Sequence, residues 1–400
     1  MKPFAALVAA CVALCCAEPA RSAQAGQDAG ESGAATAPGR AVELAAALTV
    51  DVVAAVRGGA DHRARVLSNL DLTADLDLDA LAGWSGARGF VYVLDNHGLR
   101  PNDAAGTLEG VNNIEVGRAA TRLFEAWIEQ DLGRGANLRV GLYDLNSEFY
   151  VTDSSGLLLG PPFGIGSEFA STGRNGPSIF PSSALAARLS LPLGKDGGFV
   201  RMAVLDARAQ TFGDVGGVDL HFGDGLLFIG EAGKAKGATR LAVGAWGYSR
   251  GAPNFYLAGA DGEPVRKPSY GGYAMVEHDL PLGEARKLTA FVRAGVASPD
   301  SAPFRGALQA GVLLAPALKA RPESLFSIGF HQAWTNRNFR AAARAEGVVP
   351  ANEQGIEATY ADSVLPWLSL QPDVQWVRHP GGDRQARSAL ILSLRTTASF

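Results

Sequence analysis

The chain has 400 residues, of which 47% are hydrophobic, 19% are charged and 49 are glycine. The ordinary apolar content excludes wholesale disorder, and the formal net charge of −4 argues against a nucleic-acid-binding protein, which usually carries a basic excess. The low charge and high glycine content favour a fold rich in strands and turns.

Residues 1–25 have the three parts of a secretory signal peptide. Lys2 gives the positive start, residues 4–16 form an apolar run too short to span a bilayer, and Ala23-Gln24-Ala25 offers a small-x-small cleavage site. All three cysteines lie in this segment, so the mature chain cannot depend on disulfides. Residues 26–41 are rich in glycine, alanine and serine, and we expect a flexible periplasmic tail there, before a folded domain of residues 42–400.

The segment from Val66 to Asp79 alternates with a period of two. Its even positions are mostly apolar, as at Leu70 and Leu72, and its odd positions from 69 are polar, as at Asp71 and Asp75. A helix would scatter these carboxylates around its circumference, so the pattern predicts a strand that is wet on one face only. The same alternation recurs in residues 124–132, 240–248 and 288–296.

About sixteen such segments fit between residues 42 and 400, and no later stretch reaches 18 uninterrupted apolar residues. The expected fold is therefore an all-β, antiparallel transmembrane β-barrel, because a sheet in lipid must close to leave no unpaired edge. A soluble sandwich fits less well, since it rarely needs sixteen strands. The early strands are expected at residues 42–57, 63–79, 86–96, 114–132 and 137–149. The last strand ends on Phe400, an aromatic terminus of the kind that barrel-assembly machinery reads.

The longest stretch without a strand pattern runs from Val151 to Pro181. In the expected topology it follows an outward-running fifth strand and is therefore extracellular. Its apolar residues, such as Phe163 and Phe169, need a surface to pack on, and its glycines and prolines let the backbone turn without regular structure. We expect this loop to fold into the barrel and narrow the lumen.

Five sequence runs resemble carbohydrate-selective porins of the OprB type. They are Glu125-Ala126-Trp127-Ile128-Glu129-Gln130 with Gly141-Leu142-Tyr143-Asp144-Leu145-Asn146-Ser147-Glu148-Phe149, then residues 171–181 of the loop, residues 370–376, and His379-Pro380-Gly381-Gly382. The resemblance spans roughly residues 42–400. It implies a sixteen-stranded barrel in the outer membrane of a Gram-negative bacterium, through which mono- and small oligosaccharides diffuse passively.

A sugar channel needs hydrogen-bonding groups and aromatic faces at its narrowest point. The candidate constriction residues are Arg174, Asn175 and Asp153 of the loop, with Glu125, Glu129, Trp127, Tyr143, Asp144, Asn146 and Glu148 of the neighbouring walls. For each carboxylate the alternative is a merely solvated wall residue, and for Arg174 it is an ion pair that pins the loop. The other tryptophans, Trp84, Trp246, Trp334, Trp367 and Trp376, are expected in girdles at the membrane interfaces.

No motif favours an enzyme. Residues 176–180 lack the final glycine of a nucleophile elbow, the six histidines show no metal-binding spacing, and an acidic run from Asp75 fails the calcium-loop pattern at Ala80 and Gly86. We therefore expect no catalytic residue, metal or cofactor. The expected partners are small sugars as transported solutes, outer-membrane lipid and the assembly machinery, with a homotrimer left open and no nucleic acid. A barrel hydrolase and a general, non-selective porin are the alternative functions, and the preferred sugar stays open.

Overall fold

The structure is a computed structural model that describes residues 40–194, 197–283, 285–298 and 302–400. The expected signal peptide and nearly all of the expected tail lie outside these residues. The strands are β1 Val42–Arg57, β2 Arg65–Asp77, β3 Ala87–Gly98, β4 Ala120–Gly133, β5 Ala136–Tyr143, β6 Ala184–Leu193, β7 Gly198–Asp206, β8 Leu226–Lys236, β9 Thr239–Tyr248, β10 Ala252–Ala258, β11 Pro264–Lys267, β12 Tyr270–Pro281, β13 Lys287–Ala297, β14 Phe304–Ala315, β15 Leu325–Thr335, β16 Glu353–Leu365, β17 Leu368–Arg378 and β18 Ala389–Ser399. The helices are α2 Leu78–Ala82, α3 Asn102–Ala105, α4 Ser167–Ala170 and α5 Arg337–Ala345, with 3-10 helices η2 Leu145–Ser147, η3 Asp153–Ser155, η4 Pro161–Phe163 and η5 Pro380–Gly382.

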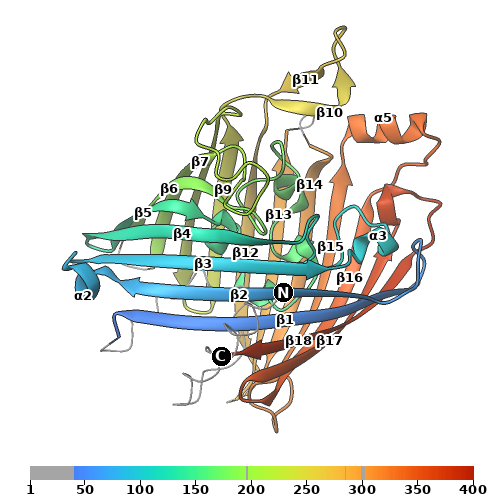
Figure 1. Ribbon diagram of the computed structural model, residues 1–400. Helices are drawn as coiled ribbons and strands as arrows, with labels where there is room; N and C mark the ends of the chain where they lie inside the picture. Colours follow the sequence, from blue (N-terminus) through green and yellow to red (C-terminus); the bar gives the residue numbers. More distant parts are fainter. Residues whose placement is uncertain (1–39, 195–196, 284, 299–301) are drawn as a thin grey trace, which may run out of the picture.

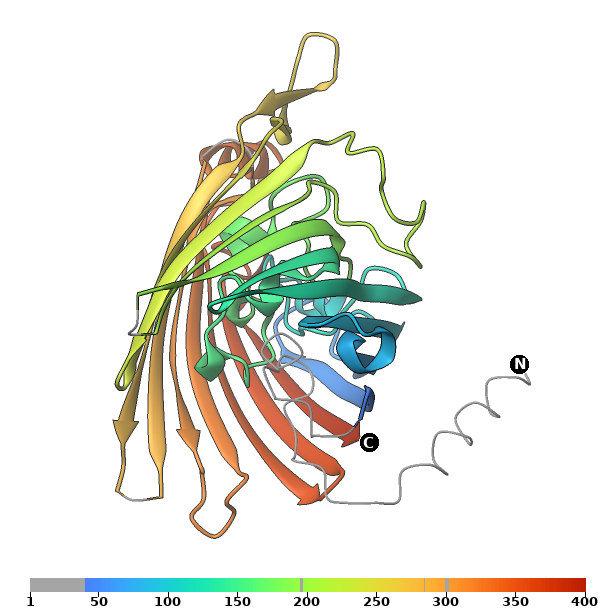
Figure 2. The ribbon, with the colours of Figure 1, turned by 90° about the vertical axis from the view of Figure 1, so that its left-hand side faces the viewer.

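Sixteen of these strands form one closed antiparallel barrel, and β10 and β11 pair separately as a hairpin (Figures 1 and 2). Closure is made by β1 and β18, where Thr49 stands opposite Thr397. The terminal Phe400 exchanges two backbone hydrogen bonds with Ala46, at 2.8 and 3.1 Å. A closed sheet has no unpaired edge, as lipid requires. The expected barrel of about sixteen strands is confirmed.

The alternation that predicted the strands separates the two faces of the barrel wall. On β2, Leu72 is 42% exposed on the outer face, whereas Asp71 is 4% exposed on the inner face. On β9, Leu241 and Val243 are 52% and 56% exposed on the outside. The apolar face therefore points outward and the polar face points into the lumen. Among the described residues, no helix is long and apolar enough to span a membrane.

Three of the expected early strands are longer than the observed ones, and two of them end early for local reasons. The second strand ends at Asp77 because its carboxylate caps α2, accepting the N–H of Asp79 at 3.0 Å. The fifth strand was expected to reach residue 149 but ends at Tyr143, since Asp144 caps η2 by accepting the N–H of Asn146 at 2.8 Å. The fourth strand begins at residue 120 rather than 114.

A β-bulge in β4 changes which side chains face inward. Tyr92 of β3 pairs with Glu125 and Val93 pairs with Leu123, so Phe124 is the extra residue. The strict alternation put Phe124 on the outer face, and this assignment is wrong. The ring is 3% exposed and packs edge-on against Tyr92 inside the barrel, with 5.4 Å between ring centroids.

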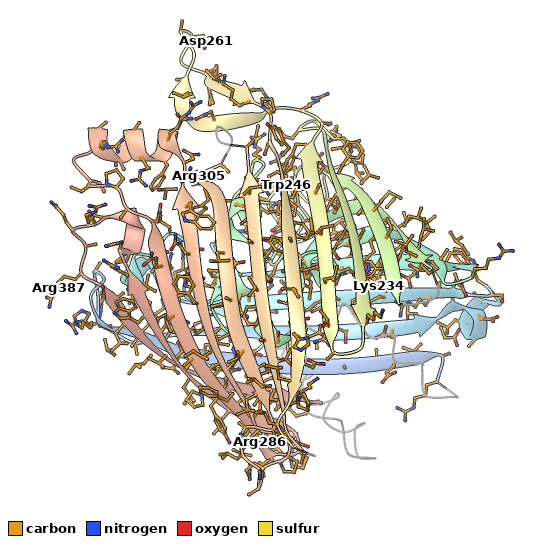
Figure 3. The ribbon with its side chains drawn as sticks, turned by 180° about the vertical axis from the view of Figure 1, so that it is seen from behind. Lys234, Trp246, Asp261, Arg286, Arg305 and Arg387 are labelled. Carbon is orange, nitrogen blue, oxygen red and sulfur yellow. The ribbon has the colours of Figure 1, made fainter. Side chains whose placement is uncertain are left out.

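The two ends of the barrel differ in the length of their connections. At the short-turn end, residues 134–135 join β4 to β5 and residues 237–238 join β8 to β9. At the other end, here called the loop end, the connections include residues 99–119, 144–183, 207–225, 249–269 and 336–352. Figure 3 shows Arg286 at the short-turn end and Arg305 and Arg387 at the loop end. Long connections face the outside in barrels of this kind, so the loop end is extracellular.

One tryptophan differs from its expected place. Trp246 was expected at a membrane interface, but it is 4% exposed and its ring stacks on Phe169 inside the barrel, with centroids 4.6 Å apart. The prediction is wrong because even-numbered positions of β9, including Trp246, face the lumen, whereas the odd-numbered Leu241 and Val243 face outward. By contrast, Trp84, Trp367 and Trp376 are 48%, 48% and 41% exposed.

Candidate functional site

The connection of residues 144–183, here called the inner loop, lies inside the barrel. It leaves β5, and four wall carboxylates bind backbone N–H groups at successive points along it. Glu125 of β4 accepts from Asp144 at 3.1 Å, Glu231 of β8 from Tyr150 at 3.0 Å, Glu277 of β12 from Ser154 at 2.8 Å, and Glu357 of β16 from Gly160 at 2.9 Å and also from Leu159. Because β16 stands far from β5 in the strand order, the inner loop crosses the lumen.

A buried arginine holds the carbonyl groups of the same loop. Arg293 of β13 is 0% exposed and donates to the carbonyl oxygens of Tyr150 at 3.1 Å, Gly164 at 3.0 Å and Pro162 at 2.8 Å. The wall thus supplies acceptors for the N–H groups of the loop and donors for its carbonyls. Irregular backbone buried away from water needs such partners, since each unpaired group costs about 1–3 kcal/mol.

Aromatic rings and small wall residues fit the inner loop against the strands. Tyr150 stacks on Tyr273 of β12, with centroids 3.9 Å apart and planes inclined by 7°. A Cβ atom built on Gly295 of β13 would lie 1.8 Å from Glu168 Oε1, so α4 can approach this wall only because residue 295 is glycine. The expectation that the loop packs on the inside of the barrel is confirmed for the described residues.

Glu168 is a buried carboxyl at this contact. One of its oxygens accepts a hydrogen bond from the Tyr150 hydroxyl at 3.0 Å, and the other has no hydrogen-bond partner among the described residues. Burial raises the pKa of Glu168 to about 7. The side chain is therefore poised to gain or lose its proton near neutral pH while it remains inside the loop–wall contact.

A network of ion pairs covers the wall between β3 and β6. Glu129 binds Arg88 at 2.8 Å and Arg139 at 3.0 Å, and Glu148 binds Arg188 at 2.7 Å. Trp127 lies beneath this network on the lumen side, as its parity predicts. Arg139 covers one face of its ring at 3.7 Å from the centroid, and Phe90 stacks on it at 5.2 Å. In this structure Trp127 therefore offers no open face to a solute.

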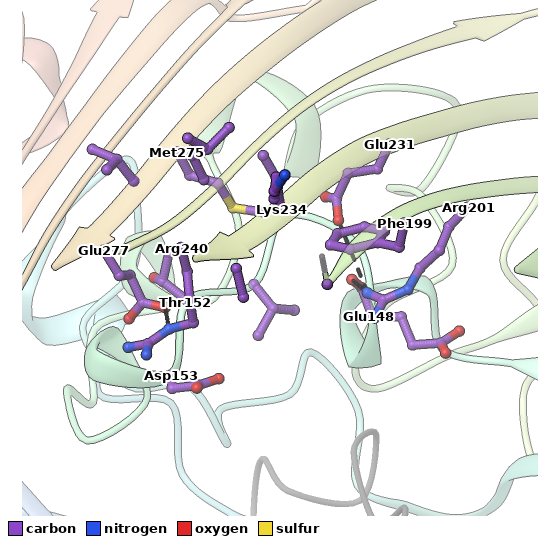
Figure 4. Close-up of a pocket in the computed structure, with 16 residues that line it drawn as sticks. Glu148, Thr152, Asp153, Phe199, Arg201, Glu231, Lys234, Arg240, Met275 and Glu277 are labelled. Carbon is purple, nitrogen blue, oxygen red and sulfur yellow. Dashed lines mark hydrogen bonds and ion pairs between the residues drawn. The ribbon is translucent and has the colours of Figure 1, made fainter. Parts of the chain in front are cut away.

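An open cavity of about 260 Å³ lies between the inner loop and the wall formed by β7, β8, β9 and β12 (Figure 4). Its lining mixes acids, bases and apolar groups. The labelled lining residues are Glu148, Thr152, Asp153, Phe199, Arg201, Glu231, Lys234, Arg240, Met275 and Glu277. The lining includes Arg201, Lys234 and Arg240, which lie in the halves of β7, β8 and β9 nearer the short-turn end. The cavity therefore lies on the side of the inner loop that faces the short-turn end, here called below the loop.

The charges of this cavity are partly neutralised by one another. Arg240 binds Glu277 at 3.3 Å and Asp279 at 3.2 Å, and Arg201 pairs with Glu231 at 3.9 Å. Arg201 also donates to the carbonyl oxygen of Glu148 at 2.8 Å. The guanidinium of Arg201 also lies over the ring of Phe199, 4.4 Å from its centroid. The cavity therefore presents both hydrogen-bond donors and acceptors beside apolar surface, without a large excess of either charge.

The structure separates the ten residues that the sequence grouped as a constriction. Only Asp153 and Glu148 line the cavity. Arg174 is exposed at the loop end and pairs with Asp224 at 3.3 Å, and the neighbouring Asn175 donates to the carbonyl of Ala209 at 2.5 Å. The other six residues hold local structure. Tyr143 donates to Glu148 at 2.5 Å, and Asn146 donates to the carbonyl oxygens of Phe149 and Gly164 at 3.1 and 3.3 Å. The remaining four make the contacts described above: Glu125, Glu129, Trp127 and Asp144.

Sequence reasoning missed the basic side of the cavity. Arg201, Lys234 and Arg240 stand on different strands, and nothing in their local sequence brings them together. The available signal was parity, since Arg240 alternates with the outward-facing Leu241 on β9. Applying the same rule to every strand would have placed Arg240 in the lumen, but not beside residue 153 of the loop.

Comparison with known proteins adds a family and a fold. The model of the family described as "Carbohydrate-selective porin, OprB family" matches residues 61–400. A structure described as the high pH structure of Pseudomonas putida OprB is similar, with a TM-score of 0.78 and 20% identity over 90% of this chain and 94% of that one. The outer membrane channel DcaP of Acinetobacter baumannii gives a TM-score of 0.53 at 11% identity, covering 90% of this chain and 97% of that one. OmpT of Vibrio cholerae in its trimer form gives 0.52 at 10%, covering 90% and 99%. No curated protein matches this sequence.

Proposed function

Because this chain belongs to the OprB family of carbohydrate-selective porins, a family of channels in the outer membrane of Gram-negative bacteria, we propose where its sugars pass. The path runs through the lumen beside the inner loop, which narrows it, and includes the cavity below that loop. The observation that carries the proposal is the mixed lining of this cavity, which includes the acids Asp153 and Glu148 and the bases Lys234 and Arg240.

Sugar hydroxyl groups both donate and accept hydrogen bonds. A wall that passes sugars therefore needs acids and bases within reach of the same solute, together with apolar surface for the C–H face of the ring. Glu148 and Asp153 supply acceptors, Lys234 and Arg240 supply donors, and Met275 and Phe199 supply apolar surface. Mono- and small oligosaccharides are the substrate class that this combination fits best.

The remaining predicted residues take other roles in this proposal. Arg174 and Asn175 stand where solutes enter, at the loop end. Glu125, together with Glu231, Glu277 and Glu357, holds the inner loop in place, while Glu129 fixes the arginines beside it.

The expected assembly and partners are also proposals. The trimer form of OmpT supports a homotrimer, since that protein shares the barrel fold. The pairing of Phe400 with β1 supports recognition of this terminus during barrel closure. Membrane lipid is expected around the exposed apolar belt.

Single-channel conductance with sugars as blockers tests the proposed path. Glucose and maltose should reduce the conductance in a saturable way, and Asp153→Asn with Lys234→Gln should weaken that block. The matched control is Asp75→Asn, which removes a lumen charge on β2 away from the cavity. A block that depends only on solute size, equal for a sugar and for a polyethylene glycol of the same radius, would favour a non-selective porin. An unchanged sugar block in the double variant would exclude the cavity from the path.

A further inference from the structure

Six exposed arginines lie close together in strand order at the loop end, on the side of the barrel from β14 to β1. They are here called the arginine rim: Arg57, Arg305, Arg344, Arg378, Arg384 and Arg387. In the part of the chain that the structure describes, none of the six has a hydrogen bond or ion pair through its side chain. The strands that carry or flank them, β14 to β18 and then β1, are consecutive around the barrel. Figure 3 shows Arg305 beneath α5 and Arg387 farther along the same rim.

Arginines elsewhere at the loop end behave differently. Arg63 pairs with Asp61 at 2.8 Å, Arg122 with Asp214 at 2.7 Å and Arg174 with Asp224 at 3.3 Å. Two further arginines, Arg118 and Arg250, each donate to a backbone carbonyl. Among the described residues of the loop end, exposed arginines without a side-chain partner are therefore concentrated in the arginine rim.

The connections that carry the rim contain few acids. Residues 336–352 include Glu346 and residues 379–388 include Asp383, and these are their only carboxylates. The two connections are joined, since the N–H of Arg384 donates to the carbonyl of Val349 at 2.9 Å and that of Ala351 to Gly382 at 2.7 Å. This pairing brings Arg384 close to the end of α5, where Arg344 lies, and leaves the cluster with a net positive charge.

The strand register places part of the rim at the edge of the apolar belt. Arg57 is opposite Leu390, Leu390 is opposite Trp376, and Trp376 is opposite Ile356, so these residues form one row across four strands. Trp376 and Ile356 are 41% and 43% exposed on the outer face. Arg378 lies two residues beyond Trp376 on the same face of β17. Tryptophans mark the membrane interface, and basic groups beside them lie at the level of the lipid headgroups.

We propose that the arginine rim binds the phosphate groups of a phosphorylated glycolipid in the outer leaflet of the membrane. Phosphate fits because a guanidinium donates paired hydrogen bonds to it, and several unpartnered guanidiniums can share the phosphates of one headgroup. A lipid fits better than a soluble anion because Arg57 and Arg378 lie on the outer face of the barrel, next to the apolar belt that contacts the membrane. The chain that binds the lipid is then anchored at one side of its barrel.

Native mass spectrometry of the detergent-solubilised protein, with diphosphorylated lipid A as the probe, tests this proposal. The variant Arg344→Gln/Arg384→Gln/Arg387→Gln removes three rim charges from exposed connections that pack little. The control Arg134→Gln/Lys236→Gln/Lys319→Gln removes three exposed charges at the short-turn end. Each rim arginine near a charged headgroup contributes about a five-fold gain in affinity, so the rim variant should bind about 100-fold more weakly. The control should bind like the parent protein, and monophosphorylated lipid A should bind the parent more weakly than the diphosphorylated form.

Four results would overturn the proposal. One is equal lipid affinity in the rim variant and the parent, and another is an equal loss in the control. A third is equal affinity for inorganic pyrophosphate and the lipid, which would mean a site for free anions. The fourth is a rim variant that loses its oligomeric state but keeps its lipid affinity, which would assign the rim to a contact between copies. Retained strand content and sugar conductance in the rim variant show that it has folded.

Discussion

Replacing Glu357 by alanine should release the middle of the inner loop from the wall without unfolding the barrel. Glu357 is 2% exposed and accepts hydrogen bonds from the N–H groups of Leu159 and Gly160. Leaving a buried donor without an acceptor costs about 1–3 kcal/mol, so the two donors together cost about 2–6 kcal/mol. The backbone pairing of residue 357 with Gly329 and Gln375 does not involve this side chain, and the strands should stay in register.

Hydrogen exchange of the loop amides measures this cost directly. At 1.4 kcal/mol per factor of ten, the exchange of Leu159 and Gly160 should accelerate by a factor between about 30 and 10⁴ in Glu357→Ala. Glu125→Ala, which frees the single N–H of Asp144, should show a smaller acceleration at its own end of the loop. Asp75→Ala should leave the loop amides unchanged. Exchange of Leu159 and Gly160 at the parent rate in Glu357→Ala would refute the idea that wall carboxylates hold the loop.

Three further predictions follow from the same contacts. Glu168 has a pKa of about 7 in the folded protein against an ordinary value of 4.5, so the folded state binds more protons than the unfolded state between these two pH values. The loop–wall contact should therefore weaken by about 3 kcal/mol as the pH rises from 4.5 to 7. Glu168→Gln should remove this pH dependence from the exchange of the loop amides, and a variant with the pH profile of the parent protein would contradict the prediction. Gly295→Ala puts a Cβ where Glu168 Oε1 lies and should destabilise the loop contact by about 1–3 kcal/mol. The control Gly247→Ala should not destabilise it, because the added Cβ would lie 3.6 Å from its nearest atom. Equal melting curves for the two variants would count against close packing at α4. Arg174→Ala removes an exposed pair with Asp224 and should change single-channel conductance less than Asp153→Asn, and the reverse order would place the narrow part of the path at the loop end.

The barrel could be predicted from sequence because apolar and polar side chains alternate along each of its strands. A strand that faces lipid on one side and water on the other must alternate, and Asp71 beside Leu72 records that alternation in the sequence. The errors arose where one residue broke the period. The bulge at Phe124 turned a side chain inward without changing the local composition, and Asp144 ended β5 early by capping a turn. Trp246 was assigned by residue type although its parity already pointed inward.

The site was harder to predict than the fold, because its contacts join residues far apart in the chain. Glu357 binds an N–H 198 residues away, and Arg293 binds a carbonyl 143 residues away. A buried glutamate that accepts backbone hydrogen bonds has the same sequence signature as a solvated lumen carboxylate. The sequence therefore predicted the inward loop from its apolar residues but could not distinguish the residues that hold it, such as Glu125, from those that face the open cavity, such as Asp153.

Liposome swelling tests the central claim, that a closed barrel with an inner loop conducts sugars, most directly. Purified protein in liposomes should speed the entry of glucose and maltose well above that into protein-free liposomes, and Glu357→Ala should change the maltose rate more than the glucose rate, because a released loop alters the width of the path. Entry of both sugars at the protein-free rate, in preparations whose strand content shows a folded barrel, would contradict the account.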